Sequence, residues 1–273
     1  MLIKLSDITL NIEELRSSNN SYQTIFFLHG FSGSSIDWKS ISSKIIDGLN
    51  IYAVDLAGHG KSDAPAEIKC YQTDSLLKQL SELLESKAKG KIILAGYSMG
   101  GRAALQFAVN FPGKLRGLIL ESATAGIAEE IKRNERIGKD EQLALFIEAH
   151  TIIEFVDYWM NIDLFSSQKK LQKEILSEVR EAKLKNSKIG LANSLRGFGT
   201  GSMPPVFDSL KKIQVKTLLI TGELDSKFTE INLEMAKLFP DVKHQIIKNA
   251  GHNVHLEQPA EFCAVINSYL KKL

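Results

Sequence analysis

Short runs of consecutive apolar residues recur along the chain, and longer segments with helical periodicity separate them. Consecutive apolar positions are typical of strands that are buried on both faces of a sheet. These runs predict strands at residues 24–28, 51–56, 91–95, 115–120, 215–221 and 242–247. The 3.6-residue period predicts helices at residues 74–87, 102–110, 228–238 and 259–270. The alternation predicts an α/β fold in which helices cover both faces of a mostly parallel sheet.

Residues 123–208 interrupt this alternation, because they carry helical patterning and no run typical of a buried strand. We expect several helices here, inserted between two strands of the sheet. Such an insertion commonly covers a ligand cleft, and an insertion without a role is the alternative. The predicted organisation is a core of residues 1–122 and 209–273, with a helical lid at residues 123–208.

Length and composition agree with one large α/β domain carrying an insertion. The 273 residues are 44% apolar and 24% charged, which is ordinary for a globular chain. A net charge of +2 argues against a general affinity for nucleic acid or for anionic membranes. No segment has the roughly 18 to 20 apolar residues of a membrane span, and no secretory leader is recognisable, so the cytoplasm is the expected location. The two cysteines, Cys70 and Cys263, are expected to be reduced.

Residues 96–100, GYSMG, match the pattern G-x-S-x-G between a predicted strand and a predicted helix. Glycines two positions before and after the serine let the backbone make a sharp strand-to-helix turn. Such a turn presents the serine hydroxyl at the carboxyl end of the sheet. Ser98 is therefore the candidate nucleophile or base, and a plain turn with a serine cap is the alternative.

A serine hydroxyl is inert at neutral pH unless a histidine takes its proton and a carboxylate orients that histidine. After the lid, Asp225 lies in the loop that follows one predicted strand, and His252 lies just past the next one. Both match the order serine, acid, histidine that accompanies this kind of turn. Glu223 is the alternative acid and His255 the alternative base. His29 precedes the serine and is therefore in the wrong order.

Residues 29–33, HGFSG, form a glycine-rich loop directly after the first predicted buried strand. Next to a serine turn of this type, one backbone N–H after the serine and one from such an early loop form an oxyanion hole. The candidate donors are the N–H groups of Met99 and Phe31. A simple connecting loop is the alternative.

These motifs and their order resemble the α/β-hydrolase superfamily across essentially the whole chain. Within it, the chain is similar to the 2-succinyl-6-hydroxy-2,4-cyclohexadiene-1-carboxylate synthases. The similar segments are HGFSGSSIDW, GYSMGGR, ESATAGI, RNERIGKDEQLA, FVDYW and LANSLRGFGTG. The resemblance implies a lyase of menaquinone or phylloquinone biosynthesis. It would eliminate pyruvate from a succinyl-enolpyruvyl cyclohexene carboxylate, with the triad serine acting as a base and with no cofactor.

A substrate with several carboxylates requires cations in the cleft, and a guanidinium group binds a carboxylate through two parallel hydrogen bonds. Arg102 lies four residues after Ser98, about one helical turn, so its side chain can face the same cleft. A solvated arginine or a structural ion pair is the alternative. The resemblance implies Arg136 as the second cation, with Arg133 as the alternative, and Trp159 as a pocket residue.

The resemblance also implies that Tyr97 contacts the substrate, and it shows one departure. Relatives usually carry a further arginine eight residues before the LANSL segment, where this chain has Lys183. Lysine keeps the positive charge but loses the planar fork of donors. We therefore expect Lys183 to make a weaker contact with the substrate, with Arg180 as the alternative residue.

The expected partner is a small polycarboxylate, with no nucleic acid and no membrane, and the expected state is a monomer or a weak homo-oligomer. No metal site is expected, since neither H-E-x-x-H nor a matching third ligand for the His252 and His255 pair occurs. A carboxylesterase or a carbon–carbon bond hydrolase could use the same triad. A non-catalytic binding protein is a third reading, which the retention of all three triad residues disfavours.

Overall fold

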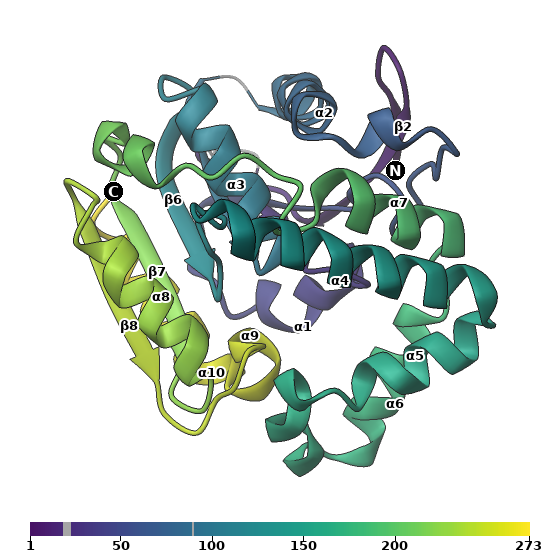
Figure 1. Ribbon diagram of the computed structural model, residues 1–273. Coiled ribbons are helices and arrows are strands. Elements are labelled where there is room, and N and C mark those ends of the chain that lie inside the picture. The colour runs from purple at the N-terminus through teal and green to yellow at the C-terminus, as the bar shows by residue number, and fades with distance from the viewer. Residues whose placement is uncertain (19–22, 89) are drawn as a thin grey trace.

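The computed structural model describes residues 1–18, 23–88 and 90–273. Its strands form one sheet in the order β1-β2-β4-β3-β5-β6-β7-β8 (Figure 1). The pairs from β4 and β3 through β8 are parallel, whereas β1 with β2 and β2 with β4 are antiparallel. The strands are β1 Leu2–Lys4, β2 Thr9–Arg16, β3 Gln23–Leu28, β4 Leu49–Val54, β5 Ile92–Tyr97, β6 Leu115–Glu121, β7 Thr217–Gly222 and β8 Val242–Ile247. The predicted α/β fold with a mostly parallel sheet is confirmed.

Helices cover both faces of this sheet and also make up the segment between β6 and β7. The α-helices are α1 Lys39–Ser42, α2 Thr73–Lys87, α3 Met99–Asn110, α4 Glu130–Ala149, α5 Ile152–Met160, α6 Lys173–Lys183, α7 Lys188–Phe198, α8 Ser226–Ala236, α9 Val254–Glu257 and α10 Pro259–Leu270. The described ranges also contain the short 3₁₀ helices η1 Ser35–Trp38, η2 Ile68–Tyr71, η3 Asp163–Lys170 and η4 Phe207–Lys212.

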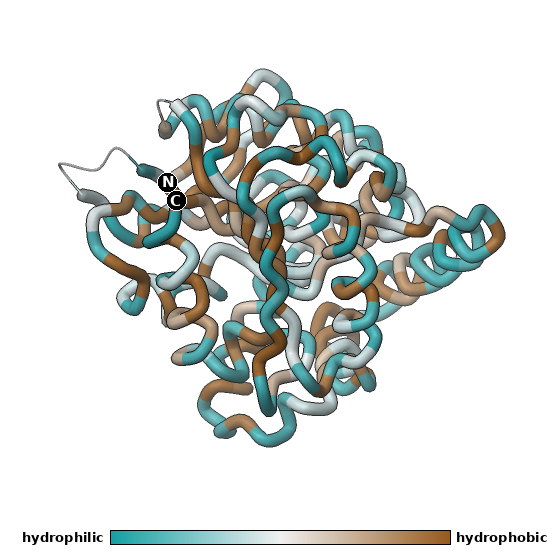
Figure 2. The backbone as a smooth tube through the Cα atoms, turned by 90° about the vertical axis from the view of Figure 1, so that its left-hand side faces the viewer, coloured by the Kyte–Doolittle hydropathy of each residue, from teal (hydrophilic) through white to brown (hydrophobic). Residues whose placement is uncertain are grey.

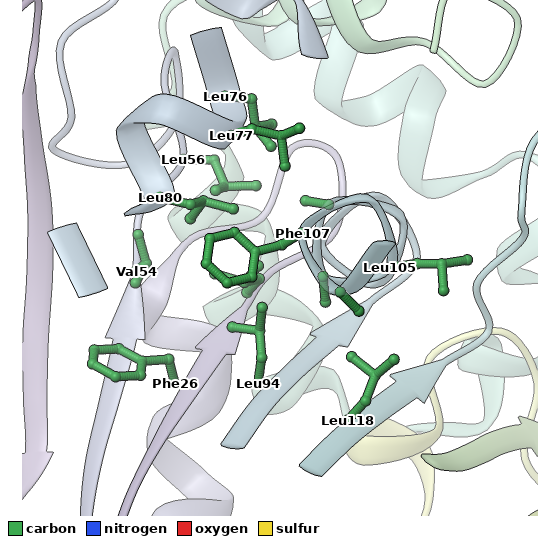
Figure 3. Close-up of a cluster of buried hydrophobic side chains, with 14 of the residues drawn as sticks. Phe26, Val54, Leu56, Leu76, Leu77, Leu80, Leu94, Leu105, Phe107 and Leu118 are labelled. Atoms are coloured by element: carbon green, nitrogen blue, oxygen red, sulfur yellow. The ribbon is translucent and has the colours of Figure 1, made fainter. Parts of the chain in front are cut away.

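The hydrophobic core lies in two layers, one on each face of the sheet. Phe26 and Leu28 of β3 point into the layer beneath α2 and α3, and the alternate residues Ile25 and Phe27 point into the layer beneath α1 and α10. Figure 3 shows Phe107 of α3 in the first layer, among side chains from the strands and from α2. In Figure 2, hydrophobic segments run through the middle of the molecule and hydrophilic ones lie toward the outside. The two-layer burial explains why the parallel strands read as continuous apolar runs.

Between β6 and β7, the elements that the structure describes are all helical. In Figure 1, α4 to α7 lie together on the side of the molecule away from β8. α4 packs along α7, and these helices have a small apolar cluster of their own, formed by Ala144, Ile147, Phe155, Val156, Leu191, Ala192 and Leu195. We call α4 to α7 with η3 the helical insertion. The lid boundaries at residues 123 and 208 stay a prediction.

Some element boundaries differ from those expected. β1 and β2 are not among the strands expected from apolar runs, because most residues of each are exposed or only partly buried and the sequence pattern alternates. α3 begins at Met99, three residues before the expected start, because β5 turns directly into this helix. Among the described residues, no helix is long and apolar enough to cross a membrane.

Candidate active site

The turn from β5 into α3 holds Ser98 in a strained backbone conformation, with φ at +50°. A Cβ atom on Gly96 would collide with the backbone of Gly100, and one on Gly100 would collide with the carbonyl of Leu28. Glycine is therefore required at both positions for the chain to turn this tightly. The N–H of Ser98 donates to the Glu121 carbonyl at 2.8 Å. The local sequence thus forces the serine side chain out of the turn, as the G-x-S-x-G pattern predicts.

The structure brings the three predicted residues Ser98, His252 and Asp225 into one hydrogen-bonded chain. His252 Nε2 lies 3.0 Å from Ser98 Oγ, and His252 Nδ1 lies 2.6 Å from Asp225 Oδ2. The imidazole is 2% exposed and Asp225 is 7% exposed, so water competes little for these bonds. Asp225 also caps α8, where its Oδ1 accepts a hydrogen bond from the Phe228 N–H at 3.3 Å. This cap holds the carboxylate in place toward the imidazole.

The alternative acid and bases have other partners. His255 is buried against Glu121, which accepts from the His255 N–H at 3.0 Å and lies 2.7 Å from its Nδ1. Glu223 accepts from the Asn249 N–H at 3.1 Å. His29 Nε2 accepts from the Leu56 N–H at 3.0 Å. Each of these side chains is held in a separate structural contact, away from Ser98.

A cavity of about 610 Å³ opens over Ser98 and His252, between the carboxyl end of the sheet and the helical insertion. Among the residues that the structure describes, neither the Phe31 N–H nor the Met99 N–H donates to a protein acceptor. Both donors are therefore free to meet a ligand in the cavity. Eight of the predicted site residues line it, namely Phe31, Tyr97, Ser98, Met99, Arg102, Arg136, Trp159 and His252.

Arg102 is the most enclosed cation of this cavity, with 8% of its surface exposed. Its Nη1 donates to the Phe198 carbonyl at 2.7 Å, and its guanidinium lies 5.2 Å from the Phe198 ring centroid. Within the described chain it has no salt bridge to a carboxylate. Burial, together with the nearby charge of Arg136, lowers the pKa of Arg102 to about 9. Asp140 is near enough to offset part of this lowering of the pKa, but it forms no ion pair with Arg102. A desolvated cation without a paired anion favours the binding of an anionic ligand.

Arg136 of α4 also faces the cavity, and it is already paired. Its Nε donates to Asp140 Oδ1 at 2.8 Å, while Asp140 Oδ2 is buried and has no hydrogen-bond partner within the described part of the chain. The alternative residue Arg133 donates to the backbone carbonyls of Ile127 and Ala128 instead. The structure therefore places Arg136 rather than Arg133 in the cavity wall.

Trp159 and Tyr97 form aromatic walls of the cavity. The Trp159 ring meets the Phe31 ring edge-on at 5.2 Å, and its Nε1 is buried with no acceptor among the described residues. The Tyr97 ring lies 5.4 Å from His252 and 5.1 Å from His255. Burial raises the pKa of Tyr97 well above its ordinary value, so its phenol is neutral. Trp159 and Tyr97 thus present neutral aromatic surfaces to a ligand.

Lys183 and Arg180, the two candidates for the third cation, lie outside the larger cavity. Lys183 donates to Ser32 Oγ at 3.0 Å and lines a smaller neighbouring cavity of about 50 Å³. Arg180 forms two hydrogen bonds with Asp157, at 2.7 and 3.1 Å, on the surface. Neither residue lines the larger cavity. The role of Lys183 in binding the substrate stays a prediction.

Two cations in the cavity wall were missed by sequence reasoning, namely Lys139 of α4 and Lys227 of α8. Residues three apart share a helix face, so the spacing from Arg136 to Lys139 was a usable signal. Lys227 lies two residues after Asp225 and could have been found from that proximity. Over the ranges 1–18, 23–88 and 90–273, no group of three or more His, Cys, Asp or Glu side chains could hold a metal ion.

Comparison with known proteins yields matches along most of the chain. Residues 23–259 match the family described as alpha/beta hydrolase fold. A protein of Bacillus subtilis (strain 168) named putative 2-succinyl-6-hydroxy-2,4-cyclohexadiene-1-carboxylate synthase is 41% identical over 254 residues, which cover 93% of this chain and 92% of that protein. The synthase of that name from Enterobacter sp. (strain 638) is 29% identical over 94% of this chain and 95% of its own length. The solved structure of MenH from S. aureus superposes with a TM-score of 0.91 at 35% identity, covering 96% of this chain and 98% of that one.

Proposed function

Because this chain belongs to the alpha/beta-hydrolase fold family, and within it to the 2-succinyl-6-hydroxy-2,4-cyclohexadiene-1-carboxylate synthases, we propose that it is a lyase of menaquinone or phylloquinone biosynthesis. The substrate is 2-succinyl-5-enolpyruvyl-6-hydroxy-3-cyclohexene-1-carboxylate, from which the enzyme eliminates pyruvate. One observation carries this proposal. The 41% identity extends over 93% of the chain, and that stretch includes a complete Ser-His-Asp chain of hydrogen bonds.

The proton transfer begins at Ser98. Asp225 accepts the Nδ1–H of His252, which leaves Nε2 as the proton acceptor 3.0 Å from Ser98 Oγ. As His252 takes the hydroxyl proton, the Ser98 oxygen removes the ring proton next to the succinyl carbonyl. The electrons of that C–H bond form an enolate, so negative charge develops on the carbonyl oxygen.

The same site must stabilise that charge and then release pyruvate. The unused N–H groups of Phe31 and Met99 supply two donors for the enolate oxygen. When the carbonyl re-forms, a second ring double bond appears and the C–O bond to the enolpyruvyl group breaks. Ser98 is a hydroxyl again once it holds the ring proton, so His252 passes the proton that it took to the departing pyruvate enolate and returns to its neutral form. Atoms and charges balance without a redox partner.

We assign the binding of the substrate carboxylates to the cations that line the cavity. Arg102 is a desolvated cation without an anionic partner, and Arg136 keeps donors beyond its single bond to Asp140. We assign both to carboxylates of the substrate, since a guanidinium can bind each with two parallel hydrogen bonds. The Trp159 ring supplies an aromatic surface in the same cavity.

The deciding experiment measures pyruvate release from the enzymatically prepared intermediate, by coupling to lactate dehydrogenase. We expect release well above the spontaneous rate, and release at the spontaneous rate removes the lyase assignment. A nitrophenyl ester and a fluorophosphonate serve as controls. Fast ester turnover with rapid labelling of Ser98 would instead identify a carboxylesterase or a carbon–carbon bond hydrolase that uses the same triad.

Location and assembly belong to the same proposal. We expect the enzyme to act on this small polycarboxylate in the cytoplasm, as a monomer or a weak homo-oligomer. Light scattering after size-exclusion chromatography tests the assembly, because a stable dimer keeps its mass on dilution whereas a weak one dissociates.

A further inference from the structure

Ser32 has an unusual position directly after Phe31, whose N–H is one proposed oxyanion donor. Its backbone is left-handed, with φ at +61°, and the residue is completely buried. A serine in this conformation carries a cost of about 1 kcal/mol or more, so the surrounding structure must hold it there. Whatever fixes Ser32 also fixes the peptide that carries the Phe31 N–H.

The groups that hold Ser32 come from the helical insertion. Lys183, the last residue of α6, donates from Nζ to Ser32 Oγ at 3.0 Å. Asn186, three residues later, donates from Nδ2 to the Ser32 carbonyl at 2.9 Å. The amide oxygen of Asn186 accepts from the Gly60 N–H at 2.9 Å, which anchors it to a second loop of the core. We call the two bonds to Ser32 the Ser32 clamp.

The Lys183 ammonium contacts Ser32 and does not line the larger cavity. It lines the small cavity together with Asp37, Gln168 and His255, and the larger cavity over Ser98 is lined by other cations. Burial removes much of the water around the Lys183 ammonium, and this loss lowers the pKa of Lys183. The Ser32 hydroxyl replaces part of that lost hydration.

We propose that Lys183 and Asn186 are positioning residues that hold the loop of Phe31 and Ser32, and with it the Phe31 N–H, in place for the developing enolate oxygen. This inference rests on the proposed function. It gives Lys183 a role in orienting the catalytic loop in place of a contact with a substrate carboxylate. The insertion thereby completes the oxyanion hole of the core.

A double-mutant cycle tests the clamp. Lys183→Met, Ser32→Ala and the double variant are compared with the parent in pyruvate release. We expect each single variant to lower kcat by about 10- to 100-fold, because a displaced oxyanion donor slows the chemical step. KM should change less than about threefold, and the double variant should be no slower than the slower single variant. Lys173→Met, the same substitution at an exposed position of α6, is the matched control and should leave kcat and KM unchanged.

Two results would overturn the clamp. A rise in KM of about tenfold or more for Lys183→Met, with an unaffected Ser32→Ala, identifies Lys183 as a substrate ligand. Independent effects that multiply in the double variant show that the two side chains do not act together. If Lys183→Met fails to fold, Ser32→Ala and Asn186→Ala still decide the matter, because each must lower kcat at unchanged KM.

The clamp and the proposed function fail in different ways. A parent enzyme that releases no pyruvate refutes the lyase, and the same variants are then assayed on 4-nitrophenyl acetate, whose hydrolysis also needs an oxyanion hole. A tenfold or greater loss in that assay supports the clamp, and parental rates refute it. A parent that releases pyruvate with unaffected clamp variants refutes the clamp alone.

Discussion

The core loops and the helical insertion meet at the cavity, and they differ in how firmly their side chains are held. Asp225 and His252 are less than 10% exposed and are joined to Ser98 by hydrogen bonds of 2.6 and 3.0 Å. Arg136 and Lys139, the cations that α4 of the insertion adds to the cavity wall, are by contrast half-buried and exposed. The core therefore fixes the reacting groups, and the insertion supplies charge from elements with less burial.

Packing explains this difference. The sheet has apolar layers on both faces, whereas the insertion has one small cluster that includes Phe155 and Leu191. Regions with few buried apolar contacts open at a lower free energy than the global unfolding of the protein. We therefore expect the insertion to open before the triad is disturbed when a ligand enters. The predictions below test that difference, beginning with the core.

Ser98→Ala should have the largest effect, because it removes the group that transfers the proton. We expect kcat to fall by about 10⁴- to 10⁶-fold, as for triad residues generally. KM and Tm should stay close to the parental values, since the Ser98 side chain lies at the cavity wall. Steady-state pyruvate release and a thermal melt measure both. A variant that keeps more than about one hundredth of the parental kcat would show that another group abstracts the proton.

Arg102→Ala should have the next largest effect. This arginine belongs to the core helix α3, and its guanidinium donates a hydrogen bond to the Phe198 carbonyl at the end of α7. Arg102 therefore connects the core to the helical insertion. Its loss leaves a substrate carboxylate unpaired in a buried site, which costs about 2 to 5 kcal/mol, or roughly 30- to 5,000-fold in kcat/KM. An unchanged kcat/KM would show that Arg102 does not bind the substrate. A dicarboxylate that raises the Tm of the parent but not of this variant would give independent support.

Arg136→Met in the insertion should have a smaller effect, of about tenfold and mainly on KM. The reason is that Arg136 already has an anionic partner in Asp140, so a substrate carboxylate competes for it. Kinetics of pyruvate release separate KM from kcat. An effect as large as that of Arg102→Ala would mean that the insertion determines affinity to the same extent as the core.

Arg180→Ala should change kcat/KM by less than about twofold, because exposed ion pairs contribute little. Its guanidinium is bound to Asp157 on the surface, away from both cavities. This variant is the control for positive charge on the insertion, and it is measured in the same assay. A loss of tenfold would show that Arg180 reaches the substrate in the occupied enzyme and takes the place of the missing arginine.

Much of the core could be predicted from the sequence, because its signals are local. The turn around Ser98 needs glycines at positions 96 and 100, where any side chain would collide with backbone. The buried strands appear as continuous apolar runs, and Ser98, Asp225 and His252 follow the strands β5, β7 and β8 in that order. Among the strands that the structure describes, β1 and β2 escaped this reasoning, since they lie at the antiparallel edge and are partly exposed.

The remaining contacts depended on distant parts of the chain. Glu121 and His255 pair across 134 positions of sequence, and Lys183 reaches Ser32 across 151. No local pattern marks such a pair, because each residue type alone is compatible with solvent, an ion pair or a ligand. Periodicity likewise placed Arg102 and Arg136 on helices but could not tell that one would be paired with Asp140 and the other left without an anion.

The amino-acid sequence was enough to predict the α/β sheet, the serine at a sharp turn, and the order of the serine, the acid and the histidine. These features depend on strand burial and backbone sterics, which act between residues that are neighbours in the sequence. The three-dimensional structure was needed to identify the cations that face the cavity. It was also needed to show that Lys183 binds Ser32 and does not line that cavity. Those outcomes depend on how the insertion packs against the core, and burial together with hydrogen bonding across that boundary sets which charges remain available to a ligand.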